Sequence, residues 1–345
     1  ESWGTKQFLT DPGTGSGHPT LVACPDWEAG CPAGGEVFLA WQQNESGNPF
    51  QPRYRIRYAT WLPAFGWTAV NEADPDAGQV VVHDMTPSAI YVADEPFLSW
   101  TRQILGSPAD ADALPRRRLA YRHIGVGPMH VANDLPDSIV APNLVAGPGG
   151  SNPDVLLTFV RPDGDRGPIG TELSLHVAAA ECVIGLCDWT WHQARDPRGR
   201  TIYGERPQYV RGGAWSSIVL RVFRFEGKNG EPIASNDPIG SILSSGDLVR
   251  LSPNYANGVV QVTSITADGL MHYGHAVAYD PGSDSVVTMA TLFDSGGLAP
   301  VRSILKKGGI GSVTGYGKLL SPAGLASNIE VRALPAIPDF VIESF

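Results

Sequence analysis

The sequence predicts an all-β chain, a β-propeller built from four-stranded antiparallel blades. Three observations support this fold class. A phrase containing proline recurs along the chain, apolar segments of strand length follow its copies, and no segment has the period and end signals of a capped helix. The 40 glycines and 29 prolines among 345 residues also supply the turns that many short strands need.

The recurring phrase is clearest at residues 18–23 (HPTLVA) and 141–146 (APNLVA). Looser copies stand at residues 86–90, 206–210 and 299–301, and a copy without proline at 246–249. Proline has no N–H for a ladder, so within a sheet it occupies an edge strand, a bulge or the first position of a strand. It also favours extended geometry in the residue before it. Each copy is therefore expected to open a strand.

The first and third copies are followed by matching series of four strands. After His18 the apolar runs are 20–23, 37–41, 54–59 and 67–70, and after Ala141 they are 143–146, 155–159, 172–177 and 189–191. The run at 54–59 alternates as a half-buried strand does. Two series of nearly equal length indicate a repeated four-stranded unit.

The remaining runs extend this pattern along one domain, residues 1–345. Four-stranded units in series are typical of propeller blades. Six blades is the expected number, five or seven being the alternatives, and a pair of Greek-key sandwiches is the second fold considered. The blades are placed at residues 18–85, 86–140, 141–204, 205–245, 246–298, and 299–345 together with 1–17.

One segment carries a resemblance to a known family. Residues 54–61 (YRIRYATW) lead through a turn into Gly66-Trp67-Thr68. This order resembles the sialidase-like, Asp-box-type β-propellers, where a strand begins just after a proline and the third and fourth strands meet at a turn ending in tryptophan. The resemblance covers two or three blades. The Asp-box itself is absent, and residues 62–67 and the loop between Cys182 and Cys187 stand in its place, so the resemblance concerns the fold more than the activity.

Charge narrows the classes of partner. The net charge is −10, the pI is about 5.2, and only 17% of residues are charged. Nucleic acid and anionic membranes attract basic surfaces, so neither is expected as the main partner. A carbohydrate or another small extracellular ligand is expected, with protein partners as a further possibility, and no membrane-spanning segment is visible in the sequence.

The four cysteines form two close pairs, Cys24/Cys31 and Cys182/Cys187, at equivalent places in the two best repeats. Zinc binding is the alternative, but no Cys-x-x-Cys spacing exists. Two local disulfides are predicted, which indicates an oxidising compartment.

Because the chain starts at Glu1 rather than Met, we expect a mature secreted protein, extracellular or periplasmic, whose targeting segment has been removed.

The first strands of a propeller all start at one face, around a central funnel, so residues near the strand-opening prolines should converge. Asp84, Glu205 and Asp247 are the candidate carboxylates for glycoside hydrolysis, which needs two. His18 is a candidate base for a lyase reaction instead. Arg206 is expected to bind a substrate carboxylate, as one member of the arginine cluster of sialidase-like enzymes would. Neutral hydrogen-bonding candidates follow the prolines: Thr20, Ser88, Asn143 and Gln208.

Each of these residues also has a structural interpretation, because Asp before a strand commonly serves a turn. No cofactor is expected; calcium is a possibility at acidic turns such as Asp163-Gly-Asp165 and Asp74-Pro-Asp76.

Two functions remain open. One is an enzyme, a glycoside hydrolase or polysaccharide lyase with its site in the funnel. The other is a non-catalytic lectin-like protein or a scaffold subunit. A lectin would repeat its polar residues in each blade, whereas an enzyme would not.

Overall fold

The computed structural model consists of antiparallel β-sheets, and no helix occurs among the residues it describes. No membrane-spanning helix is therefore found in that part of the chain. The described residues are 9–10, 15–24, 35–46, 53–75, 82–92, 94–104, 116–147, 155–162, 173–211, 216–226, 247–264, 271–280, 285–293, 302–308, 314–317, 329–333 and 340–344.

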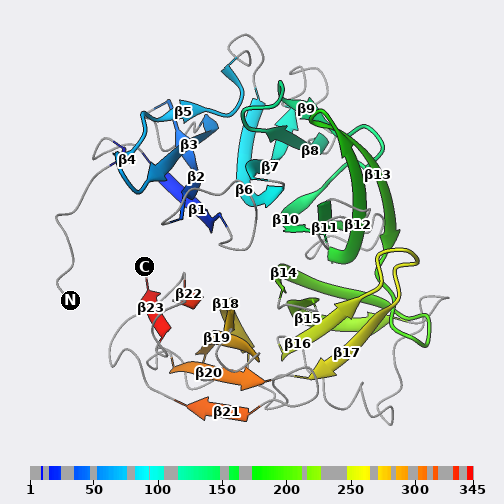
Figure 1. The fold of residues 1–345 in the computed structure, drawn as a ribbon. Helices are drawn as coiled ribbons and strands as arrows, with labels where there is room; N and C mark the ends of the chain where they lie inside the picture. Colours follow the sequence, from blue (N-terminus) through cyan, green and yellow to red (C-terminus); the bar gives the residue numbers. More distant parts are fainter. Residues whose placement is uncertain are drawn as a thin grey trace. The chain divides into compact units, whose positions relative to one another are not determined.

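The first two sheets are four-stranded meanders (Figure 1). Sheet A contains β1 (Ser16–Ala23), β2 (Val37–Asn44), β3 (Tyr54–Leu62) and a fourth strand in two pieces, β4 (Gly66–Trp67) and β5 (Asn71–Glu72). Sheet B contains β6 (Val82–Val92), β7 (Glu95–Ile104), β8 (Arg116–His123) and β9 (His130–Val131).

Sheet C is longer and joins two such meanders. Its strands are β10 (Val140–Ala146), β11 (Val155–Pro162), β12 (Leu173–Val183), β13 (Leu186–Gln193), β14 (Thr201–Arg211), β15 (Ser216–Glu226), β16 (Asp247–Pro253) and β17 (Val260–Ser264). A single residue pair, Ser174 with Tyr203, connects β12 to β14. Sheet C is thus a meander of β10–β13 followed by a meander of β14–β17.

The last two sheets contain the remaining six strands. Sheet D has β18 (Met271–Asp280), β19 (Ser285–Phe293), β20 (Arg302–Gly308) and β21 (Thr314–Gly317), and sheet E has β22 (Ile329–Ala333) and β23 (Phe340–Ser344).

Most strands overlap the predicted apolar runs, but β1, β6 and β14 begin before the proline that was expected to open them, β23 was not predicted, and the grouping after residue 205 differs from the prediction. β16 was expected to open a new blade at residue 246, yet it pairs with β15 on one side and β17 on the other. β20 likewise pairs with β19 and β21 rather than opening a sheet. An apolar run shows that a strand is present and does not show which neighbour it pairs with. The expected strand near residues 6–9 lies mostly outside the described residues.

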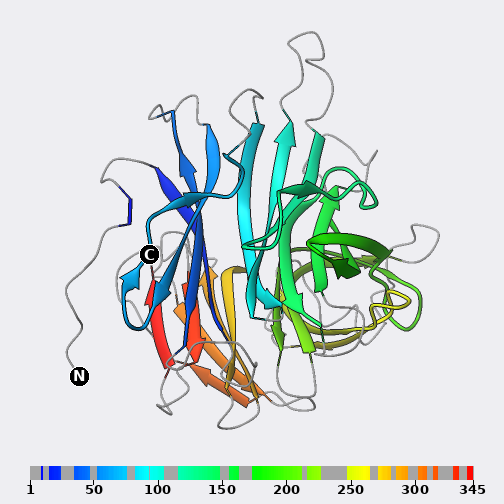
Figure 2. The same ribbon diagram turned by 45° about the horizontal axis from the view of Figure 1, so that its top comes forward.

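The chain divides into two compact units, which we describe separately: Glu1–Leu156 with Ala179–Thr190, and Leu157–Ala178 with Trp191–Phe345. Within the first unit β6 contacts both β1 and β10, so successive first strands are neighbours (Figure 2). Within the second unit β18 contacts both β14 and β22 in the same way. Six blades and a closed ring remain predictions.

The proline phrase forms a β-bulge inside the first strand. In β1, β6 and β14 the register shifts by one residue across the positions 18–19, 86–87 and 206–207. The residue before each proline has a left-handed backbone, with φ of 50° at His18, 51° at Thr86, 49° at Ala141 and 50° at Arg206. The expectation of extended geometry before proline is therefore wrong at these positions. The bulge, one of the places where a strand tolerates proline, is the geometry that repeats.

A second contact repeats where the last strand leaves the sheet. The backbone N–H groups of three buried alanines, Ala73, Ala132 and Ala194, donate to third-strand carbonyls, those of Ile56, Leu119 and Leu175 respectively, at 2.9 to 3.0 Å. The residues before these carbonyls are two arginines, Arg55 and Arg118, and one serine, Ser174. Equivalent backbone positions thus carry polar side chains that are not all alike, and sheet A places Arg55 at the edge where β6 begins.

The core between sheets A and B is apolar and closely packed. It includes Phe38, Ile56, Leu98 and Trp100, all at most 1% exposed, and the Phe38 ring stacks on Tyr58 with centroids 5.4 Å apart. Burial of side chains of this size contributes about 1.5 to 3 kcal/mol each. This core holds the two sheets together beneath the polar edge described next.

We predict that Ala141→Gly stabilises the protein by about 0.5 to 1 kcal/mol, because removal of the Cβ relieves the left-handed strain by more than the added chain entropy costs. Chemical denaturation measures the change. Ala59→Gly, in the regular strand β3, is the matched control and should destabilise the protein. A loss of stability in both variants would contradict backbone strain at Ala141.

Candidate functional site

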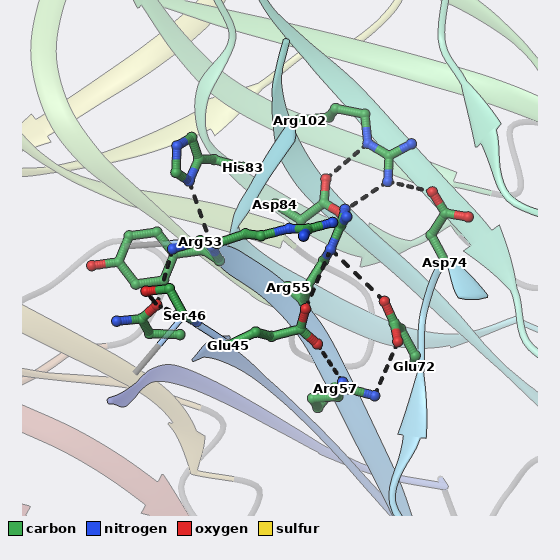
Figure 3. A network of polar contacts seen from close by, with 12 residues as sticks. Glu45, Ser46, Arg53, Arg55, Arg57, Glu72, Asp74, His83, Asp84 and Arg102 are labelled. Atoms are coloured by element: carbon green, nitrogen blue, oxygen red, sulfur yellow. Dashed lines mark hydrogen bonds and ion pairs between the residues drawn. The ribbon is translucent and has the colours of Figure 1, made fainter. Parts of the chain in front are cut away.

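A network of charged side chains lies at one edge of sheets A and B (Figure 3). It is formed where β2 ends, β3 begins, β5 ends, β6 begins and β7 ends. Antiparallel pairing brings the strand ends of each sheet to one edge, and the packing of β6 against β2 and β3 places the two edges side by side, so residues distant in sequence meet there. The network consists of Glu45, Arg53, Arg55, Arg57, Glu72, Asp74, His83, Asp84 and Arg102, all in the first unit.

The inner half of the network is buried. Asp84 is 1% exposed, and its two carboxylate oxygens accept hydrogen bonds from Arg102 Nε and Nη2, both at 2.8 Å. Arg102 Nη2 also donates to Asp74 Oδ2 at 2.6 Å. Arg55, itself 1% exposed, places Nη1 3.6 Å from Asp84 Oδ2. One carboxylate of β6 is therefore held between an arginine of sheet A and an arginine of sheet B.

These contacts keep Arg102 charged despite its burial. Burial acts to lower the pKa of Arg102, but the hydrogen bonds and charges of Asp84 and Asp74 outweigh it, and the pKa is raised above its ordinary value. Two charges taken out of water are compatible with folding only when they are paired and hydrogen-bonded, as here.

The outer half of the network contains two carboxylates that share one guanidinium. Glu45, Arg57 and Glu72 each expose a quarter of the side chain. Arg57 Nη2 pairs with Glu45, and Arg57 Nη1 lies 3.1 Å from Glu72 Oε2. Arg55 Nε lies 3.7 Å from Glu45 and 3.9 Å from Glu72, which ties this pair to the buried half. The outer half thus presents paired carboxylates at the surface.

The protonation of Glu72 is biased by its surroundings. Burial raises the pKa of Glu72 above its usual range, and the nearby charges of Glu45 and Asp74 act in the same direction, whereas Arg57 and Arg55 oppose it. Of two neighbouring carboxyl groups, the one with the raised pKa is the one suited to donate a proton.

Arg53 is the arginine of the network that pairs with no carboxylate among the described residues. Its side chain extends into the network in Figure 3, and its Nε is buried without a hydrogen-bond partner there. Arg53, Arg55 and Arg57 alternate along the chain, so they share one face where the strand is regular. A guanidinium of this kind can bind an oxyanion in two-point fashion.

His83 borders Arg53 and Asp84. Its Nδ1 accepts a hydrogen bond of 3.4 Å from the backbone N–H of Tyr54, so the neutral ring carries its proton on Nε2. Burial lowers the pKa of His83, the charge of Asp84 opposes this, and Arg55 and Arg53 lower it further. The imidazole is therefore a neutral hydrogen-bond donor at this edge.

The sequence candidates of the first unit occupy neighbouring first strands. Asp84 belongs to the buried half of the network, and the Thr86 N–H beside it donates to Gln42 Oε1 at 3.2 Å. Ser88 is buried, and its Oγ accepts from the Leu144 N–H at 2.9 Å, which links β6 to β10. His18 is exposed on β1, and Thr20 and Asn143 are half-buried. Asp84 alone of these joins the charged network.

The other sequence candidates belong to the second unit. Glu205 on β14 forms an ion pair with Arg221, its cross-strand neighbour on β15. Arg206 is exposed at the bulge, and Gln208 follows it, half-buried. The backbone of Asp247 pairs with Val222 at the start of β16.

Sequence reasoning missed most of the network. Glu45, Arg55, Arg57, Glu72 and Arg102 were not proposed, and Asp74 was considered only as part of a calcium turn. The signal that was present is the alternation Arg53-x-Arg55-x-Arg57 on a strand otherwise expected to be half buried. No group of three or more potential metal ligands is found among the described residues.

The disulfide prediction is confirmed for Cys182–Cys187, which closes the β12–β13 hairpin. Cys24 is also disulfide-bonded. Its expected partner, Cys31, lies outside the described residues.

No family model and no curated protein sequence matches this chain. Solved structures do. Trypanosoma rangeli sialidase in complex with sialic acid matches with a TM-score of 0.55 and 11% identity, covering 94% of this chain and 51% of that chain. The same enzyme with the inhibitor DANA matches with a TM-score of 0.53 and 11% identity, covering 95% and 52%.

These matches confirm the predicted likeness to the sialidase-like propellers at the level of the fold. This chain spans about half the length of the sialidase chains that it matches. A GH43 β-1,3-galactosidase matches with a TM-score of 0.42 and 10% identity, covering 87% of this chain and 94% of that chain.

We predict that Asp84→Asn destabilises the protein by about 3 to 5 kcal/mol, because it leaves the buried charges of Arg102 and Arg55 without a full counter-charge. Denaturant unfolding measures the loss. Asp137→Asn is the control, since the Arg118–Asp137 pair is partly exposed on both sides and should be worth at most about 1 kcal/mol. Equal effects of the two substitutions would contradict a network held together by Asp84.

We also predict that Glu72→Gln makes the protein more stable than wild type at neutral pH. A carboxyl group whose pKa is raised by folding stabilises the fold at low pH, and this contribution is lost as the pH rises through the raised value. The difference between variant and wild type should therefore grow from pH 4 to pH 7 in denaturant titrations. Glu181→Gln, at an exposed carboxylate, is the control. A variant less stable than wild type at neutral pH would show that Glu72 is stabilised as the anion.

Proposed function

We propose that this chain is a glycoside hydrolase of propeller fold that acts on extracellular glycans carrying an acidic group. The observation that carries the proposal is the pair Glu45 and Glu72, bridged by Arg57 and about one quarter exposed, in which burial raises the pKa of Glu72. Glycosidases need two carboxyl groups near the scissile bond, one of them protonated.

Each residue has a role in this proposal. Glu72 gives its proton to the leaving glycosidic oxygen, and Glu45 acts on the opposite side of the sugar, as a nucleophile or as the base for water. Asp84, Arg102 and Arg55 are positioning residues, because their buried contacts fix the arginine face on which both glutamates rest. Arg53 binds the acidic group of the sugar. The matched sialidase was solved with sialic acid, which is such a sugar.

The absence of repetition favours an enzyme over a lectin with one site in each blade. The residues before the four prolines share one backbone conformation but are His18, Thr86, Ala141 and Arg206. The third-strand positions that correspond to Arg55 carry a second arginine, Arg118, and a serine, Ser174, but Arg118 pairs with the partly exposed Asp137 and not with a buried carboxylate. Repetition of the backbone with different side-chain partners is what a single specialised site produces.

The proposal includes the finer features expected from the sequence. The propeller has six blades, and His18, Thr20, Ser88 and Asn143, on neighbouring first strands of the first unit, contact the substrate. The Cys182–Cys187 disulfide supports an oxidising, extracellular or periplasmic location.

A second candidate is a glycan-binding protein without turnover. One observation favours it: within the described network both Glu45 and Glu72 contact arginines. Carboxylates that are held in ion pairs suit a fixed surface that binds a glycan without reacting with it. A lyase is a further variant, in which His18 abstracts a proton and no carboxylate pair is required.

We predict hydrolysis of acidic fluorogenic glycosides, such as sialosides and glucuronides. Glu72→Gln should lower kcat by about 100-fold or more, and Arg53→Ala should raise KM for acidic but not for neutral substrates. Glu181→Gln is the control. Full turnover by Glu72→Gln overturns the assignment. Arg53-dependent binding on a glycan array without any turnover establishes the second candidate, and release of an unsaturated sugar establishes the lyase.

A further inference from the structure

The first unit exposes a small apolar tip, which we define as Val126, Val183, Ile184 and Leu186. Val183, Ile184 and Leu186 form the turn between β12 and β13 and are 72%, 82% and 60% exposed, and Val126 in the turn between β8 and β9 is 38% exposed. The two turns touch, because a Cβ on Gly185 would lie 3.6 Å from His123 Cβ and 3.8 Å from Val126 Cγ1. Exposure of a contiguous group of aliphatic side chains to water is unfavourable, and such a patch marks a candidate interaction site.

The apolar tip is held rigidly. The Cys182–Cys187 disulfide closes the hairpin immediately behind it. Ile184 and Gly185 have φ values of 50° and 80°, as a tight two-residue hairpin turn requires. The backbone N–H of Cys187 donates to the buried hydroxyl of Tyr121 at 3.1 Å. A tip fixed in this way loses little conformational entropy when it binds.

The size of the apolar tip limits its partner. Four side chains of this kind expose on the order of 400 Å² of apolar surface, about half of what each partner buries in a stable protein interface. Insertion into a lipid bilayer needs no complementary surface, and each side chain taken out of water contributes about 1.5 to 3 kcal/mol. The thin hairpin therefore fits a bilayer surface better than a second protein.

The charges around the apolar tip select the kind of lipid. Exposed Glu181 and Asp188 flank the hairpin, and Glu95 lies against Gly125 in the neighbouring turn. Among the described residues near the tip, Arg122 is a cation, and its guanidinium donates hydrogen bonds to the backbone carbonyls of Gly127 and Ala73. Carboxylates repel anionic head groups, so the surface favours a zwitterionic membrane. We propose that the apolar tip anchors the protein peripherally to zwitterionic lipid, independently of any action on glycans.

Cosedimentation with phosphatidylcholine vesicles tests this proposal. The wild-type protein should bind them, and should bind vesicles containing phosphatidylserine more weakly. The double substitution Ile184→Ser/Leu186→Ser should reduce binding at least tenfold while thermal unfolding stays unchanged. Ile104→Ser, at a 38% exposed isoleucine outside the tip, is the matched control and should bind as wild type.

Three outcomes would overturn the proposal. One is the absence of wild-type binding to phosphatidylcholine at millimolar lipid, and another is equal binding by the double variant. The third is a dimer of the wild-type protein, measured by light scattering, that the double variant loses, since the occupant of the tip would then be a second copy of the chain. Cys182→Ser/Cys187→Ser provides an independent check, because loss of the clamp should weaken vesicle binding without removing any side chain of the tip.

Discussion

The candidate site depends on the pairing of Asp84 with two arginines from different sheets. Arg102 reaches Asp84 within sheet B, and Arg55 approaches it from sheet A, with all three side chains almost excluded from water. Charges in such a place must remain paired, so sheets A and B can shift little relative to each other at this edge without a large cost. The outer glutamates take their positions from this buried pairing through Arg55 and its neighbour Arg57.

Repetition of the backbone and variation of the side chains together explain how such a site can arise. The bulge before each proline and the buried alanine at the end of each of the first three meanders are the same local solution used again. Both features concern the backbone, so they leave the side chains at equivalent places free to differ. Arg55 can enter an ion network where Ser174, at the corresponding place, forms a hydrogen bond with His176. A specialised site can therefore develop at one strand edge without disturbing the others.

The sequence predicted the local features well because their causes are local. Alternation indicated most of the strands, and the short spacing of Cys182 and Cys187 indicated their disulfide. The recurring prolines marked the first strands correctly but were expected to open them, whereas they lie inside β1, β6 and β14. The left-handed residue before proline was not predicted, because the bulge imposes a conformation against the local preference of that residue. The place of β16 was misjudged because its apolar run resembles that of a first strand, whereas its pairing depends on β15 and β17. Asp84 was singled out for its position near Pro87, but its partners were not predicted. Arg102 becomes its neighbour through the pairing register of β6 and β7, and Arg55 through the packing of sheet A against sheet B, and neither can be read from the local sequence.

The most direct test of this account is the titration of Glu72 itself, followed by carbon-13 NMR of its side-chain carboxyl group. The account predicts a midpoint above the ordinary glutamate value of about 4.3, because the buried pairing of Asp84 with Arg55 and Arg102 holds Glu72 in a partly desolvated place beside Glu45. A midpoint at or below that value would contradict it, since Glu72 would then be a stabilised anion and could not supply the proton on which the proposed chemistry depends.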